Sequence, residues 1–121
     1  MDSILQTIKK MLGELPEEYD CFDQELLIYI NSAISTLTQL GVGPSEGFYV
    51  QDSSTTWNDF IPDDPRLTMV KTYIYLKVKI VFDPPSSSYI LDSYQKTINE
   101  LEWRLNVLCD NDENPSIEQD I

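Results

Sequence analysis

The chain has 121 residues with 21 acidic and 8 basic side chains, a net charge of −13, and no histidine. This charge argues against a nucleic-acid reader, because phosphate contacts need clustered lysine and arginine, and it suits a chain that meets basic partners or lets DNA pass unheld. Without histidine, Ser–His–Asp and Cys–His sets are impossible, and we expect no catalytic, cofactor-binding or metal-binding residues.

The length fits one domain with a modest core, which we place at residues 1–108. No run of about twenty apolar residues occurs, so we predict no membrane-spanning helix. The first residues, MDSILQTIKKML, lack the pattern of a signal peptide, which predicts that the chain is made and kept in a cytoplasm. In that compartment Cys21 and Cys109 are expected to be free thiols.

Two amphipathic helices are predicted in the first third of the chain, at residues 3–12 and about 23–40, and each is followed by a glycine. Ser3 is a possible N-cap of the first, and Asp20 or Asp23 can cap the second. The second helix has an uncharged polar face, which is either ordinary solvent surface or a surface that packs lightly against a neighbour. That face consists of Asn31, Ser32, Ser35, Thr36 and Thr38.

Residues 48–51 and 54–57 are predicted to form a short β-hairpin between the second and third helices. An isolated hairpin is only marginally stable, so it must lean on the helices. Trp57, Phe60 and Ile61 are expected to supply that contact. For Trp57 the alternatives are a place in the core or a role as an aromatic anchor in an interface, where tryptophan is enriched.

The most apolar stretch, Arg66–Phe82, fits both a strand alternation and two adjacent helical stripes. We choose a helix, because the stretch is longer than a typical strand and is bounded by prolines, with Asp63 or Asp64 as its cap. With two apolar stripes, one side is expected to face the core and the other is available to another subunit. Lys77 projects into the apolar half, where either its stem packs and its ammonium reaches solvent, or it makes an intersubunit salt bridge.

The last helix is predicted to begin at one of the serines at 86–88 and to end near Leu108. Trp103 and Val107 lie one turn apart and away from its apolar seam, which is a modest indication of an interface. Residues 109–121 carry five acids and no base, which predicts an acidic tail that is disordered in the free protein. The fold class is therefore mainly α, a small four-helix bundle with a β-hairpin and a flexible acidic tail.

Four segments carry a resemblance to a known family. They are FDQELLIYINSAISTLTQLGVG at residues 22–43, TTWNDFI before the central helix, VKTYIYLKVKIVFDPPSS through its end, and LEWRLN in the last helix. In this order and spacing they are similar to the phage head–tail connector family, the small DNA-packaging adaptors of long-tailed phages and prophages. The resemblance covers residues 3–108 and leaves the acidic tail outside.

The resemblance implies a structural role without cofactor or membrane. About a dozen copies would form a ring under the portal, around the DNA channel, and would join the portal protein to the next head-completion (stopper) or tail protein. The chain would be made in the host bacterial cytoplasm and end in the virion, and DNA would pass through it without sequence-specific binding. Candidate contact residues for subunits or portal are Trp57, Lys77, Trp103 and Val107.

Two other functions fit the same composition. The net charge of −13 without a basic patch is also typical of an acidic inhibitor that mimics DNA. A mimic needs carboxylates spaced like phosphates along one face, whereas these acids cluster in loops, at helix starts and in the tail. The second alternative is a small regulatory binding protein with no place in the virion.

Overall fold

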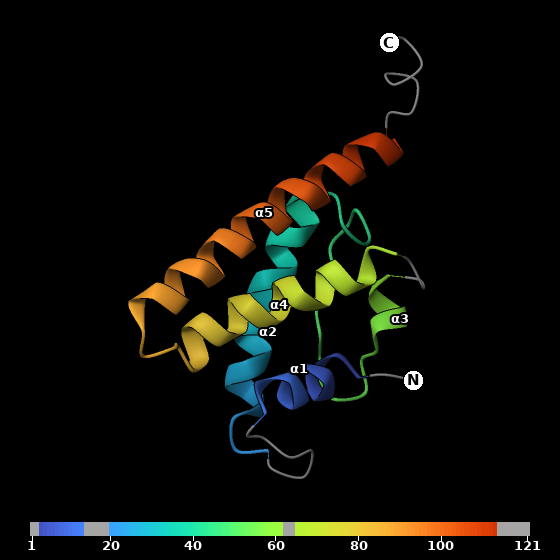
Figure 1. Cartoon of the computed structure of the whole chain (residues 1–121). Coiled ribbons are helices and arrows are strands. Elements are labelled where there is room, and N and C mark those ends of the chain that lie inside the picture. The colour runs from blue at the N-terminus through green and yellow to red at the C-terminus, as the bar shows by residue number, and fades with distance from the viewer. Residues whose placement is uncertain (1–2, 14–19, 62–64, 114–121) are drawn as a thin grey trace.

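The computed structural model describes residues 3–13, 20–61 and 65–113, and it confirms a mainly helical fold. Its helices are α1 (Ile4–Leu12), α2 (Asp23–Gln39), α3 (Trp57–Phe60), α4 (Leu67–Phe82) and α5 (Ser88–Glu113). In Figure 1, α4 and α5 run side by side, α2 crosses α4, and α1 lies near the foot of the bundle. Among the described helices, none has the length and hydrophobicity needed to cross a membrane.

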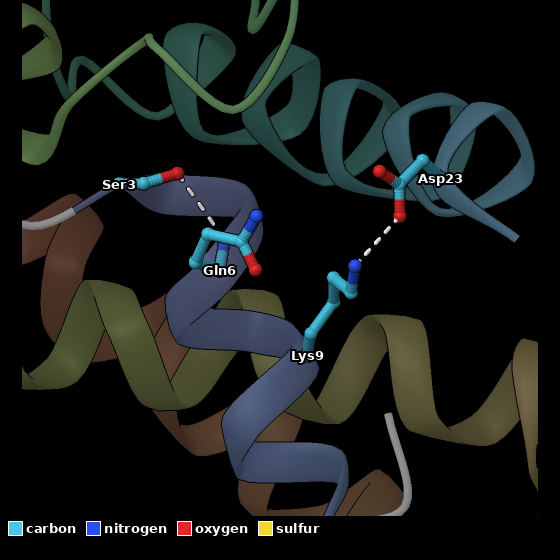
Figure 2. A network of polar contacts seen from close by, with 4 residues as sticks. All are labelled: Ser3, Gln6, Lys9 and Asp23. Carbon is cyan, nitrogen blue, oxygen red and sulfur yellow. Dashed lines mark hydrogen bonds and ion pairs between the residues drawn. The ribbon is translucent and has the colours of Figure 1, made fainter. Parts of the chain in front are cut away.

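Helix α1 begins and ends as predicted. The Ser3 hydroxyl accepts a hydrogen bond from the Gln6 backbone N–H at 3.2 Å, as Figure 2 shows, so Ser3 is the N-cap. Gly13 ends the helix in the left-handed conformation (φ 86°), and its N–H donates to the carbonyls of Lys9 and Lys10.

The start of α2 differs from its prediction, because neither Asp20 nor Asp23 caps it with a side chain. The Asp23 carboxylate instead forms an ion pair with Lys9 of α1, with Nζ 3.0 Å from Oδ1 (Figure 2). The Lys9 side chain is only 1% exposed, and a buried ammonium needs a nearby carboxylate. Asp23 therefore links α1 to α2 through an ion pair and does not act as the N-cap of α2. At the other end, Gly41 takes φ 97°, as expected of a residue after a helix.

The predicted β-hairpin is wrong: the described residues contain no strand, and a single bridge joins Ser3 to Thr56. Side chains take the place of a partner strand. Asn31 of α2 hydrogen-bonds both the N–H and the carbonyl of Val50, and the Asp52 carboxylate accepts from the Ser54 N–H at 2.8 Å. Because side chains already hydrogen-bond these backbone groups, the groups are satisfied without a paired strand.

Helix α3 is an element that the sequence analysis does not predict. Thr56 and Asp59 form a reciprocal capping box around its start, in which each side chain accepts from the other residue's backbone N–H. The helix turns Trp57, Phe60 and Ile61 into the core, which confirms that these residues anchor the segment. Gly43 lies directly against Phe60, where a Cβ atom would be 2.5 Å from Cε1.

Helix α4 is the centre of the bundle and packs against α1, α2 and α5. Its fully buried side chains come from both predicted stripes and are Val70, Tyr73, Ile74 and Val78. The subunit itself thus covers both stripes, and the expectation that one side is left for another subunit is wrong for most of the helix. Near its end, Val81 remains 55% exposed. The predicted caps Asp63 and Asp64 lie outside the described residues.

Helix α5 follows the predicted seam, with Ile98, Leu101 and Leu105 buried against the core. The Ser87 hydroxyl accepts from the Ile90 N–H at 3.4 Å, in agreement with a serine cap. The helix continues to Glu113, beyond the predicted end near Leu108, because no glycine or proline occurs before Pro115. Disorder of the acidic tail stays a prediction, since residues 114–121 lie outside the described part.

Candidate functional site

The described residues contain no group of three or more acidic, histidine or cysteine side chains placed to hold a metal ion. The predicted contact residues are Trp57, Lys77, Trp103 and Val107. Trp103 and Val107 lie one turn apart on α5, whereas Trp57 lies on α3 and Lys77 lies on α4.

Trp57 is a core residue in this subunit, with 3% of its surface exposed. Its indole N–H donates to the Thr7 hydroxyl of α1 at 3.0 Å, and the Lys71 Nζ lies 5.4 Å from its ring centroid. A buried indole with its N–H bonded is satisfied within the subunit. This agrees with the core-packing alternative and leaves little of Trp57 for a partner to contact.

Lys77 is half-buried on α4, and its Nζ lies 5.9 Å from the centroid of the Tyr73 ring. A cation over an aromatic face at this distance is attracted by the ring quadrupole. In the described part of the chain, no carboxylate lies within ion-pair distance of this ammonium. The stem thus packs along the subunit, while the charge stays available to a carboxylate from outside.

Tyr73 fixes α5 to α4 next to the exposed tryptophan. Its side chain is fully buried, and its hydroxyl donates to Glu102 Oε2 at 2.7 Å. Burial, followed by the hydrogen bond to this carboxylate, raises the pKa of Tyr73 above its ordinary value. The sequence analysis missed this pair, although a tyrosine in an apolar stripe signals a buried hydroxyl that needs a partner.

Trp103 directly follows Glu102 and points outward, with 67% of its surface exposed. Val107, one turn further along α5, is 36% exposed. Beside them Arg104 and Glu100, four residues apart on the helix, form an ion pair, with Nη2 3.0 Å from Oε1. A tryptophan this exposed, on a helix that a partly buried hydrogen bond joins to α4, is suited to contact a partner.

A match to one known protein family covers nearly all of the chain. The model of a family described as phage connector protein matches residues 4–112, which span α1 to all but the last residue of α5. No curated protein and no solved structure matches the chain. Because the match extends over nearly all of its length, this chain belongs to the phage connector protein family.

Proposed function

We propose that the chain is a structural subunit of the head–tail junction of a tailed phage. About a dozen copies form a ring under the portal, around the DNA channel, and join the portal to the next head-completion or tail protein. The observation that carries this proposal is the family match over residues 4–112. A compact helical subunit with an outward-facing Trp103 supports it.

The subunit offers separate surfaces for its partners. Trp103 and Val107 form an apolar pair on the outside of α5, and the Lys77 ammonium is available for an ion pair. We propose these three residues as contacts to neighbouring subunits or to the portal. Trp57 contributes indirectly, because its burial holds α3 against α1.

The positions of the acids argue against the DNA-mimic alternative. Several carboxylates are already engaged within the subunit, among them those of Asp23, Asp83, Glu100 and Glu102. A mimic needs unengaged carboxylates in a row, because a DNA-binding enzyme must find them as it finds phosphates. No charged residue occurs between Glu25 and Glu46, so α2 cannot supply such a row.

The experiment that tests the proposal mixes the purified chain with the portal ring encoded in the same genome and images the mixture by electron microscopy. We expect a second, symmetric ring at one end of the portal, and the chain in purified particles at the same copy number. An intact portal that stays bare in the presence of folded chain, or mature particles without the chain, would refute the proposed function.

A further inference from the structure

The outward face of α2 carries a single exposed acid, Glu25 in its first turn, although the whole chain has a net charge of −13. No charged residue occurs between Glu25 and Glu46, and the helix turns its aliphatic stripe toward α4. On the opposite side, Ile28 is 67% exposed, and the neighbouring positions three and four residues away on the helix are uncharged except for Glu25. We call this surface the α2 face and define it as Gln24, Ile28, Ser32, Ser35 and Gln39, all of them exposed.

The outward face of α5 has no net charge, because its exposed acidic and basic side chains are equal in number. Its exposed apolar side chains are Tyr89 at 82%, Trp103 at 67% and Val107 at 36%. The exposed charged side chains between Tyr89 and Val107 are two acids and two bases whose charges cancel: Asp92, Lys96, Glu100 and Arg104. We call this surface, from Tyr89 to Val107, the α5 face.

The two faces lie on different helices. Helices α2 and α5 both pack on α4, which lies at the centre of the bundle (Figure 1). The residues of each face are exposed, so each face is on the side of its helix turned away from the core. A contact between two such different faces is heterologous: each subunit uses one face toward one neighbour and the other face toward the next. Repetition of that contact gives a closed ring if the rotation closes.

Charge decides which surfaces two copies can bring together. Each copy is strongly negative, so contacts through the acidic loops are opposed by like-charge repulsion. Asp20, Asp52 and Asp59 are exposed in or beside these loops, whereas the α2 face has only Glu25 at its edge and the α5 face balances its acids with bases. A contact between the two faces therefore brings together less negative charge than a contact through the acidic loops.

We propose that the α2 face of one copy docks on the α5 face of the next copy. Ile28 covers exposed aromatic surface of the neighbouring α5, and Ser32 and Ser35 let the two helices approach closely. The serine hydroxyls and the Gln39 amide hydrogen-bond the charged side chains between Tyr89 and Trp103. This proposal rests on the ring that we propose as the function, and it names the surfaces that close it.

The test uses two charge-introducing variants, Ile28→Glu and Trp103→Glu, and the control Thr68→Glu. All three sites are exposed, so the thermal unfolding of each variant should match that of the wild type, and Thr68 places the same charge on α4, away from both faces. Self-association is measured by sedimentation of the free chain over a range of concentrations, and by the number of copies bound to the portal ring in electron microscopy.

We expect Ile28→Glu and Trp103→Glu each to weaken self-association by about tenfold or more, and Thr68→Glu to leave it unchanged. Mixing the two weakened variants should give a one-to-one dimer and nothing larger, because each supplies the face that the other lacks. If Trp103→Glu dimerises alone while Ile28→Glu stays monomeric, α2 pairs with itself and the heterologous contact is wrong. Complete rings formed by either variant would also overturn it.

The connector role and the contact between the two faces can be refuted independently of each other. A wild-type chain that self-associates through these two faces but ignores the portal refutes the connector role and keeps the contact. A chain that decorates the portal with complete rings in spite of both substitutions keeps the role and refutes the contact. A wild-type chain that remains monomeric both alone and with the portal refutes both.

Discussion

The carboxamide of Asn31 in α2 binds both backbone groups of Val50. Its Oδ1 accepts from the Val50 N–H at 2.6 Å, and its Nδ2 donates to the Val50 carbonyl at 3.0 Å. Val50 itself is buried, with 1% of its surface exposed. One side chain thus does for this segment what a neighbouring strand does in a sheet, and the path of the chain from Gly41 to Thr56 depends on it.

Asn31→Ala is expected to lower the free energy of unfolding by about 2–3 kcal/mol, because it leaves two backbone groups of buried Val50 without partners. Urea denaturation measures the change. Ser32→Ala, at the next and exposed position of α2, serves as the control and should change stability by less than about 0.5 kcal/mol. Equal effects of the two substitutions would show that the bonds to Val50 contribute nothing.

Gly43→Ala should destabilise the fold more than Gly47→Ala. Both glycines have positive φ, 83° and 98°, so each substitution carries a backbone strain of about 1–2 kcal/mol. Only at Gly43 would the new Cβ meet Phe60, which is buried and stacked on Phe48 at 5.0 Å, whereas no atom lies within 4 Å at Gly47. We expect a further loss of about 1 kcal/mol or more at Gly43, read from thermal unfolding. Equal losses of stability for the two variants would mean that the Phe60 ring moves aside without a cost in free energy.

Tyr73→Phe should cost about 1–2 kcal/mol, because it removes the hydroxyl that donates to Glu102. The pKa of Tyr73 is raised in the folded state above its ordinary value of 10.0. Its contribution is therefore fully present below about pH 10 and is lost as the pH rises further, by up to about 1.4 kcal/mol per pH unit.

The Tyr73→Phe variant should accordingly lose less stability than the wild type between neutral and strongly alkaline pH. Denaturation curves across this range measure it, with Tyr89→Phe as the control, because Tyr89 is 82% exposed. If both variants follow the wild-type pH profile, the Tyr73 hydroxyl is not held neutral by the fold.

Asp23→Asn should lower stability by about 1–3 kcal/mol, because the nearly fully buried Lys9 ammonium loses a carboxylate partner. Glu25→Gln is the matched control: it also removes an acid from the first turn of α2, but from an exposed position. The difference between the two isolates the ion pair from the effect of the helix dipole. The ion pair carries no stability if both variants unfold at the same denaturant concentration.

Two adjacent positions of α4 should respond in opposite ways. Val78 is fully buried, so Val78→Asp places an unpaired charge in the core and should unfold the subunit, with a loss above about 4 kcal/mol. Lys77→Ala should change stability by only about 1 kcal/mol or less and weaken assembly on the portal. Circular dichroism and portal binding separate the two effects. Collapse of the Lys77→Ala subunit would contradict our assignment of its surface.

The helices were predictable because their signals are local. Apolar spacings of three and four, Ser3 before α1 and the glycines after α1 and α2 lie within a few residues of the features they determine. The failures involve residues that are distant in sequence. Asn31 hydrogen-bonds the backbone of Val50, 19 positions away, in place of a partner strand. The Asp23 carboxylate pairs with Lys9 of α1 and does not cap α2.

The site was predictable only in part, for the same reason. Exposure of Trp103 and Val107 follows from their place opposite the seam of α5. The burial of Trp57 depends on the Thr7 hydroxyl of α1, which its own neighbourhood in the sequence does not reveal. The two apolar stripes of α4 did not show whether a neighbouring subunit or the chain itself covers them.

Because α4 is enclosed by its own chain, folding of the subunit precedes its assembly with other copies. A subunit that buries Val70, Tyr73, Ile74 and Val78 without help completes its core before it meets another copy. Folding and assembly are then separate steps, in contrast to obligate oligomers whose subunits have no stable fold alone. Such a subunit can accumulate as a folded monomer, and in the ring that we propose its assembly is a later step that awaits the portal.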